Sequence, residues 1–272
     1  TLTAATTSSY STAVGYGAMI ANTTGAGNVA FGANALDANT TGANNVAIGY
    51  GAGNFNDLNS TCTFVGYDAD QSVATDFTNG TAIGNGARLT ASNSARIGDA
   101  SVTSIGGYAD WTNISDGRFK TDISENVPGL EFIMALRPVV YHLDINAINA
   151  YLNIPDSVID KNAAAQKSSE LQTGFIAQEV EKAANEINYD FDGVNKPQND
   201  KDNYSIVYSD FIPSLVKAIQ ELSKENTALK ERLAQVEQKI GVTGIQNNAA
   251  TQAPAGLSLQ QNRPNPFSNA TV

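Results

Sequence analysis

The chain is 272 residues long, with 16 Lys and Arg, 27 Asp and Glu, and a formal net charge of −11. This acidic balance argues against a nucleic-acid partner, because contacts to a phosphate backbone need clustered Lys and Arg. The one cysteine, Cys62, excludes an intrachain disulfide, and with the one histidine, His142, it cannot build a His-based metal site, so we expect no metal and no cofactor. No apolar run approaches the ~20 residues that a membrane-spanning helix needs.

Composition changes along the chain and divides it into segments. Residues 1–107 are rich in Gly, Ala, Asn, Thr and Ser and almost free of Lys and Arg, whereas the middle is an ordinary globular mixture. The first residues, 1–7, read like the interior of a longer protein. We therefore predict a mixed fold class, with repetitive β structure first and then an α+β domain that ends in a long helix.

An internal repeat runs through the first segment. Its copies align on glycines spaced by 17, 17, 17, 18 and 14 residues, namely Gly15, Gly32, Gly49, Gly66, Gly84 and Gly98. Each copy predicts a short strand of about four residues followed by a Gly-containing turn. One such strand cannot bury its apolar face alone, so stacked copies form a thin core of Ala, Val and Ile, as in solenoids. A core with so few large side chains favours pairing with other chains.

This repeat resembles a known family. The run at 45–49, Asn-Val-Ala-Ile-Gly, is similar to the Asn-x-x-Ala-Ile-Gly-type motifs in the heads of trimeric autotransporter adhesins. In that family the motifs wind a left-handed β-roll, and three rolls pack side by side. The resemblance covers residues ~10 to 107 and implies that residues 1–107 form a β-roll stalk or head.

Three other features of the repeat receive structural interpretations. We expect Cys62 to be a small buried apolar residue, and the triplet Asn22-Thr23-Thr24 to lie in polar loops at the solenoid edge. The run Gly49-x-Gly51-x-Gly53 recurs within the repeat and is not followed by an amphipathic helix, so we do not interpret it as a phosphate-binding loop.

The middle segment alternates helix and strand signals. We predict a helix at 130–136, a strand at 137–143, a polar insertion at 146–171, a strand turning into a helix at 173–182, an acidic loop at 190–203 and a strand at 204–208. Ser209 and Asp210 can cap the helix that follows. We expect His142 to be structural. The acidic loop resembles a calcium site only in part, because it lacks the glycine and the closing glutamate of an EF-hand. We therefore expect a solvated loop.

A serine and a lysine at the start of this segment are a candidate catalytic pair. A serine hydroxyl needs a base to act as a nucleophile, and a lysine serves when burial or neighbouring cations lower its pKa. Ser115 and Lys120 are five residues apart, and Gly117 permits a turn that would bring them together. The same run is also compatible with an ordinary turn and an ordinary surface lysine.

Ordered motifs give this segment a specific resemblance. They are Ser115-Asp116 with Lys120, Leu136-Arg137-Pro138, the run from Gly174 to Val180, and Tyr208-Ser209 leading to the run from Leu215 to Leu222. In this order they resemble the endosialidase-type C-terminal intramolecular chaperones of phage tail spikes, over residues ~115 to 225. That family trimerises the β-rich fibre upstream and usually then cuts itself off with a Ser-Lys dyad.

The resemblance assigns roles to three residues, and the local sequence suggests one for Asp116. It implies that Ser115 is the nucleophile, that Lys120 is its base, and that the scissile bond joins Ile114 to Ser115. Asp116 either holds the turn or orients the lysine. The corresponding segments are a linker with the cleavage site at 108–114 and a chaperone and autoprotease domain at 115–222.

The last helical pattern predicts self-association. Apolar residues and one Asn alternate in steps of four and three at Leu215, Ile219, Leu222, Asn226, Leu229, Leu233, Val236 and Ile240. This heptad seam favours a coiled coil over residues 210–240, in which Asn226 would fix the register. The resemblance to the chaperone family implies that the assembly is a homotrimer.

The C-terminal end resembles an export signal. Residues 241–258 are expected to be a flexible linker. Residues 259–272 contain Gln261-Asn262-Arg263-Pro264-Asn265-Pro266-Phe267, which is similar to the opening of the type IX secretion sorting domain of Bacteroidota proteins. That resemblance implies a cell-surface or secreted location.

Together these patterns predict a trimeric surface or tail fibre whose C-terminal domain templates the trimer and cuts the chain once at Ile114–Ser115. A cell-surface glycan or receptor is a possible partner. One alternative is a structural adhesin with a trimerisation domain that does not cut. The other is a receptor-binding tail fibre of a phage or an injection machine, located in the virion tail.

Overall fold

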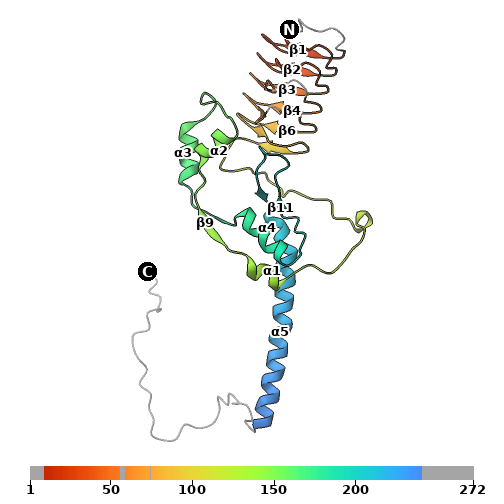
Figure 1. Cartoon of the computed structure of the whole chain (residues 1–272), viewed down its shortest axis with the longest axis vertical. Coiled ribbons are helices and arrows are strands. Elements are labelled where there is room, and N and C mark those ends of the chain that lie inside the picture. The colour runs from red at the N-terminus through yellow and green to blue at the C-terminus, as the bar shows by residue number, and fades with distance from the viewer. Residues whose placement is uncertain (1–8, 56–58, 74, 241–272) are drawn as a thin grey trace, which may run out of the picture. The chain divides into compact units, whose positions relative to one another are not determined.

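The computed structural model of the protein describes residues 9–55, 59–73 and 75–240 (Figure 1). The chain divides into two compact units, residues 1–219 and 220–272. The predicted linker at 241–258 and the predicted sorting segment at 259–272 lie outside the described residues. No helix in the described ranges is long and apolar enough to span a membrane.

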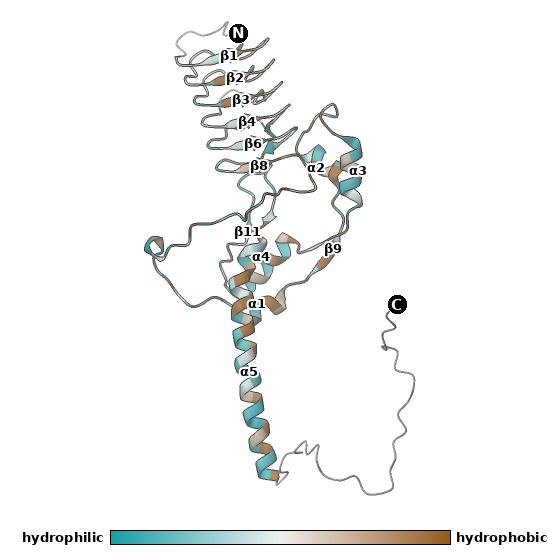
Figure 2. Cartoon of the chain, turned by 180° about the vertical axis from the view of Figure 1, so that it is seen from behind, coloured by the Kyte–Doolittle hydropathy of each residue, from teal (hydrophilic) through white to brown (hydrophobic). Residues whose placement is uncertain are grey.

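The first unit begins with a β-solenoid of short parallel strands, stacked in the order β1-β2-β3-β4-β6-β8 (Figure 2). These strands are β1 (Thr12–Val14), β2 (Val29–Phe31), β3 (Val46–Ile48), β4 (Thr63–Val65), β6 (Thr81–Ile83) and β8 (Ala95–Ile97). Thr12 pairs with Val29 and Thr81 pairs with Ala95, so the register follows the spacing of the glycines. The predicted repeat is therefore confirmed, with strands of three residues instead of about four.

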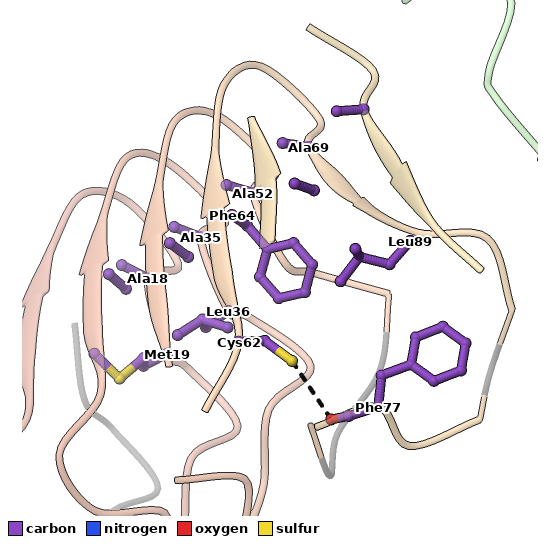
Figure 3. Close-up of a cluster of buried hydrophobic side chains, with 14 of the residues drawn as sticks. Ala18, Met19, Ala35, Leu36, Ala52, Cys62, Phe64, Ala69, Phe77 and Leu89 are labelled. Atoms are coloured by element: carbon purple, nitrogen blue, oxygen red, sulfur yellow. Dashed lines mark hydrogen bonds between the residues drawn. The ribbon is translucent and has the colours of Figure 1, made fainter. Parts of the chain in front are cut away.

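Small side chains fill the solenoid core. Figure 3 shows Ala18, Ala35, Ala52 and Ala69 recurring from one coil to the next, and all four are fully buried. Met, Leu and Phe side chains also enter this core, largely in place of the expected Val and Ile. A Cβ atom on Gly53 would lie 2.8 Å from Phe64 Cδ2 and 3.0 Å from Leu36 Cδ2, so the absence of a side chain at Gly53 makes space for Phe64 and Leu36.

The repeated glycines are required by backbone geometry. Gly32 has a φ of +142°, and a Cβ atom there would lie 2.3 Å from the carbonyl oxygen of Gly49 in the next coil. Gly15, Gly49 and Gly66 have the same conformation, with φ of +136°, +135° and +139°. Only glycine avoids both the strained conformation and the overlap, which explains why it returns in each of these coils.

Buried asparagines connect successive coils by hydrogen bonds. Asn45 donates from Nδ2 to the carbonyl of Asn59 (2.6 Å) and accepts at Oδ1 from the backbone N–H of Cys62 (2.9 Å). In the preceding coil Asn28 makes an equivalent contact, because its Oδ1 accepts from the backbone N–H of Asn45 (2.9 Å). These side chains satisfy backbone groups that the core would otherwise leave unpaired.

Asn22 corrects one expectation for the loops. It lies in a loop, as expected, but it is fully buried instead of facing solvent at the solenoid edge. Its Nδ2 donates to the carbonyl of Gly25 (2.9 Å), and its Oδ1 accepts from Nδ2 of Asn39 (3.0 Å) in the next coil. The prediction was wrong because composition alone does not separate an exposed Asn from one that replaces a backbone hydrogen-bond partner.

The solenoid ends in a second, two-stranded parallel sheet. It pairs β5 (Asp70–Gln71) with β7 (Arg88–Leu89). All four residues are buried, including the charged Asp70 and Arg88. Arg88 forms an ion pair with Asp68, so the guanidinium is not left unpaired in the interior.

The next region, residues 115–222 and here called the chaperone-like region, follows the predicted order of elements with one exception. The predicted acidic loop at 190–203 contains a short strand and the buried residues Phe191 and Val194, so it is not solvated throughout. The helices and strands of the region are α1 (Leu130–Ala135), β9 (Val139–Tyr141), α2 (Ile145–Tyr151), α3 (Lys161–Ser169), β10 (Gln172–Gly174), α4 (Ala177–Glu186), β11 (Val194–Asn195) and β12 (Ser205–Ile206). Its core is aromatic: the ring centroids of Phe132 and Phe191 are 4.9 Å apart, and those of Phe191 and Phe211 are 4.7 Å apart. Strand β10 begins at Gln172, one residue before the predicted start, and ends at Gly174.

A single helix, α5 (Phe211–Ile240), follows this core. Residues 208–210 form a 3-10 turn, η2 (Tyr208–Asp210), in place of the simple cap expected from Ser209 and Asp210. The face of α5 that carries Phe211, Ser214 and Ala218 is buried. The predicted helix is therefore present over nearly the predicted range.

Candidate self-cleavage site

The predicted scissile bond lies in an extended connection between β8 and α1. Residues 102–126, here called the cleavage segment, contain one turn of 3-10 helix, η1 (Gly117–Phe119), and are exposed except for the half-buried Asp116. Figure 1 shows this connection as a long loop with a single helical turn. Ile114 is 87% exposed, so its carbonyl is accessible to a nucleophile or to another chain. Large apolar side chains are exposed along the segment, namely those of Tyr108, Trp111, Ile114, Phe119 and Ile123.

The turn η1 brings the predicted nucleophile and base together. Lys120 Nζ donates to Ser115 Oγ at 2.8 Å. The backbone reverses between the two residues because the N–H of Phe119 bonds the carbonyl of Asp116 (3.1 Å) and the N–H of Lys120 bonds that of Gly117 (3.2 Å). The distance is within the range that proton transfer between a hydroxyl and a base requires.

Asp116 holds this turn. Its Oδ1 accepts from the backbone N–H of Arg118 at 2.9 Å, which is the position of an N-cap, and its Oδ2 pairs with Arg118 Nη2 at 2.6 Å. The hydrogen bonds from Arg118 hold the pKa of Asp116 below its ordinary value. Of the two roles considered for Asp116, the geometry favours holding the turn over orienting Lys120.

Arg118 is a site residue that the sequence reasoning did not consider. Besides its ion pair with Asp116, its guanidinium lies over the ring of Phe119, 5.7 Å from the centroid. These contacts hold the Arg118 side chain against its own turn, and neither of them involves Ser115 or Lys120. The Asp-x-Arg spacing was the signal in the sequence, because residues i and i+2 can pair across a tight turn.

Gly117 does not contribute the conformational freedom expected of it. Its φ lies outside the left-handed region, and a Cβ atom there would meet no heavy atom within 4 Å. In the single chain the turn therefore depends on the cap from Asp116 and does not need glycine.

Three of the motifs that carried the family resemblance contact one another in space. Arg137 Nε donates to Glu179 Oε2 at 3.0 Å, which joins the Arg-Pro motif to the motif from Gly174 to Val180. A Cβ atom on Gly174 would lie 2.1 Å from the hydroxyl of Tyr208, which itself accepts from the backbone N–H of Phe175 (3.2 Å). Gly174 therefore packs closely against Tyr208, and the motifs at Arg137, Gly174 and Tyr208 form one packed arrangement that does not include the exposed Ser115–Lys120 turn.

The remaining candidate residues have structural surroundings. His142 Nδ1 lies 3.1 Å from the carbonyl oxygen of Glu170. Cys62 is fully buried, as predicted, and its thiol donates to the carbonyl of Phe77 at 3.4 Å (Figure 3). Burial raises the pKa of the Cys62 thiol. Over residues 9–55, 59–73 and 75–240, no group of three or more His, Cys, Asp or Glu side chains is placed to hold a metal ion.

Comparison with known proteins gives one match. Residues 115–189 match the family described as the chaperone of endosialidase, whose name also classes it among the peptidases. No curated protein and no solved structure matches the chain. The family match supports a tail-fibre-type intramolecular chaperone, attached here to a β-solenoid.

Proposed function

We propose that the chain belongs to a homotrimeric surface or tail fibre, in which residues 115–222 template the trimer and then cut the bond between Ile114 and Ser115. The observation that carries this proposal is the 2.8 Å hydrogen bond from Lys120 Nζ to Ser115 Oγ, within a segment whose family match begins at Ser115. The solenoid is the fibre, and the enzyme acts once on its own chain.

The chemistry is an N-to-O acyl shift followed by hydrolysis. Neutral Lys120 accepts the hydroxyl proton while Ser115 Oγ attacks the carbonyl carbon of Ile114. The C–N bond then breaks, and the proton passes from Lys120 to the departing amino group of Ser115. Water hydrolyses the resulting ester, which leaves a carboxylate on Ile114 and regenerates the Ser115 hydroxyl.

Assembly is expected to switch this chemistry on. Lysine acts as a base at neutral pH only when burial or nearby positive charge disfavours its ammonium form. In the single chain, Ser115 and Lys120 are both exposed. We infer that a neighbouring copy supplies the missing burial by covering the exposed apolar side chains of the cleavage segment, so that an unassembled chain is not cut.

Two exposed apolar surfaces support the trimer. On the solenoid, one register position is apolar in each strand of the six-stranded sheet and forms a row of Val14, Phe31, Ile48, Val65, Ile83 and Ile97. All of these except the half-buried Val65 are exposed. A continuous apolar row on a surface is typical of an interface.

The second surface is the heptad seam of α5. Apolar residues recur along this helix in Figure 2, and the seam residues Leu215, Ile219, Leu222, Leu229, Leu233, Val236 and Ile240 are all exposed. Asn226, at the polar position of the seam, donates to the carbonyl of Leu222 within the helix (2.9 Å). A trimeric coiled coil would bury this stripe and bring three solenoids into register.

The fibre is proposed to act at a cell surface or as a secreted protein, with a glycan or a receptor as its partner. Export through type IX secretion depends on residues 259–272, and a virion tail is the alternative location. A β structure whose three copies must align side by side assembles slowly and benefits from a helical nucleus. Cutting the covalent link to that nucleus afterwards would leave the fibre kinetically trapped.

The deciding experiment is the intact mass of the purified chain beside Lys120→Ala, with Lys161→Ala as the control. Lys161 is also an exposed lysine, on helix α3. We expect two pieces that meet at Ile114–Ser115 in the wild type and the control, and one intact chain in Lys120→Ala. A wild-type chain that stays whole while it sediments as a trimer would leave a non-cleaving fibre with a trimerisation domain, and the catalytic roles would be withdrawn.

A further inference from the structure

Three asparagine side chains join the last coils of the solenoid to the chaperone-like region. Asn153 Nδ2 donates to the carbonyl of Ser72 (2.7 Å), and Asn199 Nδ2 donates to the carbonyl of Thr90 (2.9 Å). In the opposite direction, Asn85 Nδ2 of the solenoid donates to the carbonyl of Val158 (3.0 Å). Ser72 and Thr90 are buried, so water does not reach their carbonyl groups. Without the two asparagines, these carbonyl groups would lose a hydrogen-bond partner at the interface.

An apolar contact lies beside these hydrogen bonds. Ile154 and Val158, in the loop between α2 and α3, are only 7% and 6% exposed. A Cβ atom on Gly86 of the solenoid would lie 2.9 Å from Val158 Cγ1 and 3.8 Å from Ile154 Cγ2. The solenoid surface at Gly86 is therefore shaped to receive the loop.

The position of the contact has a physical reason. Strand β7 is at the edge of its two-stranded sheet, and an edge strand presents backbone groups that have no partner in the sheet. Asn199 bonds the carbonyl of Thr90, the residue that directly follows β7. A repeat protein needs such a cap at its end, because the last coil has no further coil to stack on.

We propose that residues 152–160, with Asn199, cap the solenoid end and keep the chaperone-like region bound to it after the chain is cut at Ile114–Ser115. The surface that this cap covers is the end of the solenoid in the same chain. Each contact joins a residue before Ile114 to a residue after Ser115, and none involves the cleavage segment. The cut therefore removes a covalent link and leaves the cap in place. This inference depends on the proposed function only for the position of the cut.

The interface also contains open space. A cleft of about 300 Å³ remains between the two sides, lined among others by Arg96 and Ile97 of the solenoid and by Leu143 and Leu152 of the chaperone-like region. An interface that is polar and incompletely filled dissociates more easily than a core unfolds. The two pieces are expected to stay together in buffer and to separate in mild denaturant before the solenoid unfolds.

The test uses the full chain and does not depend on self-cleavage. Ser115→Ala removes the proposed nucleophile, and a recognition sequence for a site-specific protease is inserted between the exposed Gly106 and Gly107. The folded protein is cut with that protease and passed over a size-exclusion column. We expect both pieces in one peak, whereas separate elution in buffer would overturn the proposal.

Variants of the cap identify the surface. Val158→Asp and the double change Asn85→Ala with Asn153→Ala are expected to weaken the association of the pieces roughly tenfold or more. Asn146→Ala, an exposed position on α2, is the matched control and should behave like the parent. Circular dichroism of each variant before cutting checks the fold, and the double Asn variant keeps the test decisive if Val158→Asp does not fold. Unchanged association in the double variant would contradict the assignment of this surface.

Discussion

The solenoid and the cleavage segment differ in how far along the chain the contacts of each residue reach. In the solenoid, Gly32 and Asn45 are determined by atoms in the next coil, at positions 17 or 14 residues away. In the cleavage segment, the contacts of Ser115 and Asp116 reach no farther than Lys120. The solenoid is therefore specified by contacts within one chain. The cleavage segment has its local geometry from its own turn, and the proposed function requires burial that another copy would supply.

The largest effect is expected from a glycine of the solenoid. Gly32→Ala combines a strained φ with overlap of the backbone of Gly49, and we expect a loss on the order of 5 kcal/mol in the free energy of unfolding. Thermal unfolding followed by circular dichroism measures it. Gly117→Ala is the matched control from the cleavage segment, where a Cβ atom meets open space. Equal losses at the two positions would contradict the difference between the two regions.

The next effect concerns a buried carboxyl group at the end of the solenoid. Burial raises the pKa of Asp70 from 3.8 to about 7, against the lowering effects of its backbone hydrogen bond at Gln71 and of the charge on Arg88, while Asp68 raises it further. The folded protein thus binds a proton that the unfolded chain releases. Stability should therefore fall as the pH rises from about 4 to about 7, by at most about 4 kcal/mol, and then level off.

Asp70→Asn is expected to remove this pH dependence and to be more stable than the wild type at pH 8. The amide oxygen can still accept the bond that Asp70 Oδ1 receives from the backbone N–H of Gln71 (2.8 Å). The measurement is the midpoint of denaturant unfolding for both proteins at pH 5 and pH 8. If the difference between the two proteins did not change with pH, the buried carboxyl would not be the cause.

A buried asparagine is expected to have the third effect. Asn45→Ala leaves the N–H of Cys62 and the carbonyl of Asn59 without their partner in the core, and we expect a loss of about 3 kcal/mol. Asn113→Ala, in the exposed cleavage segment, should leave the unfolding temperature unchanged. A similar shift for both variants would show that Asn45 acts through local propensity and not through its contacts between coils.

The smallest effect is expected in the cleavage segment itself. Asp116→Ala removes the cap of η1, so self-cleavage should slow roughly fivefold. Asp116→Asn keeps an oxygen acceptor and should cleave at nearly the wild-type rate. The rate of appearance of the two fragments measures this. Complete loss of cleavage in both variants would place Asp116 in the chemistry and not in the turn.

The sequence alone was enough to predict the elements that depend on local or periodic signals. The repeat period followed from the glycines, because a backbone that must pass close to its neighbour tolerates no other residue there. Helix α5 followed from its apolar spacing, and the Ser115–Lys120 pair followed from spacing and the family's motifs. In each of these cases the signal lies in residues near one another or equally spaced along the chain.

Only the tertiary structure decided features that depend on which residue lies opposite. Asn22 is buried because Asn39 lies beside it in the next coil, which a count of polar residues cannot reveal. The link between Gly174 and Tyr208 joins residues 34 positions apart in the sequence. The cap formed by Asn153 and Val158 on the solenoid likewise joins segments distant along the chain. Such contacts are set by packing in three dimensions, and no local propensity encodes them.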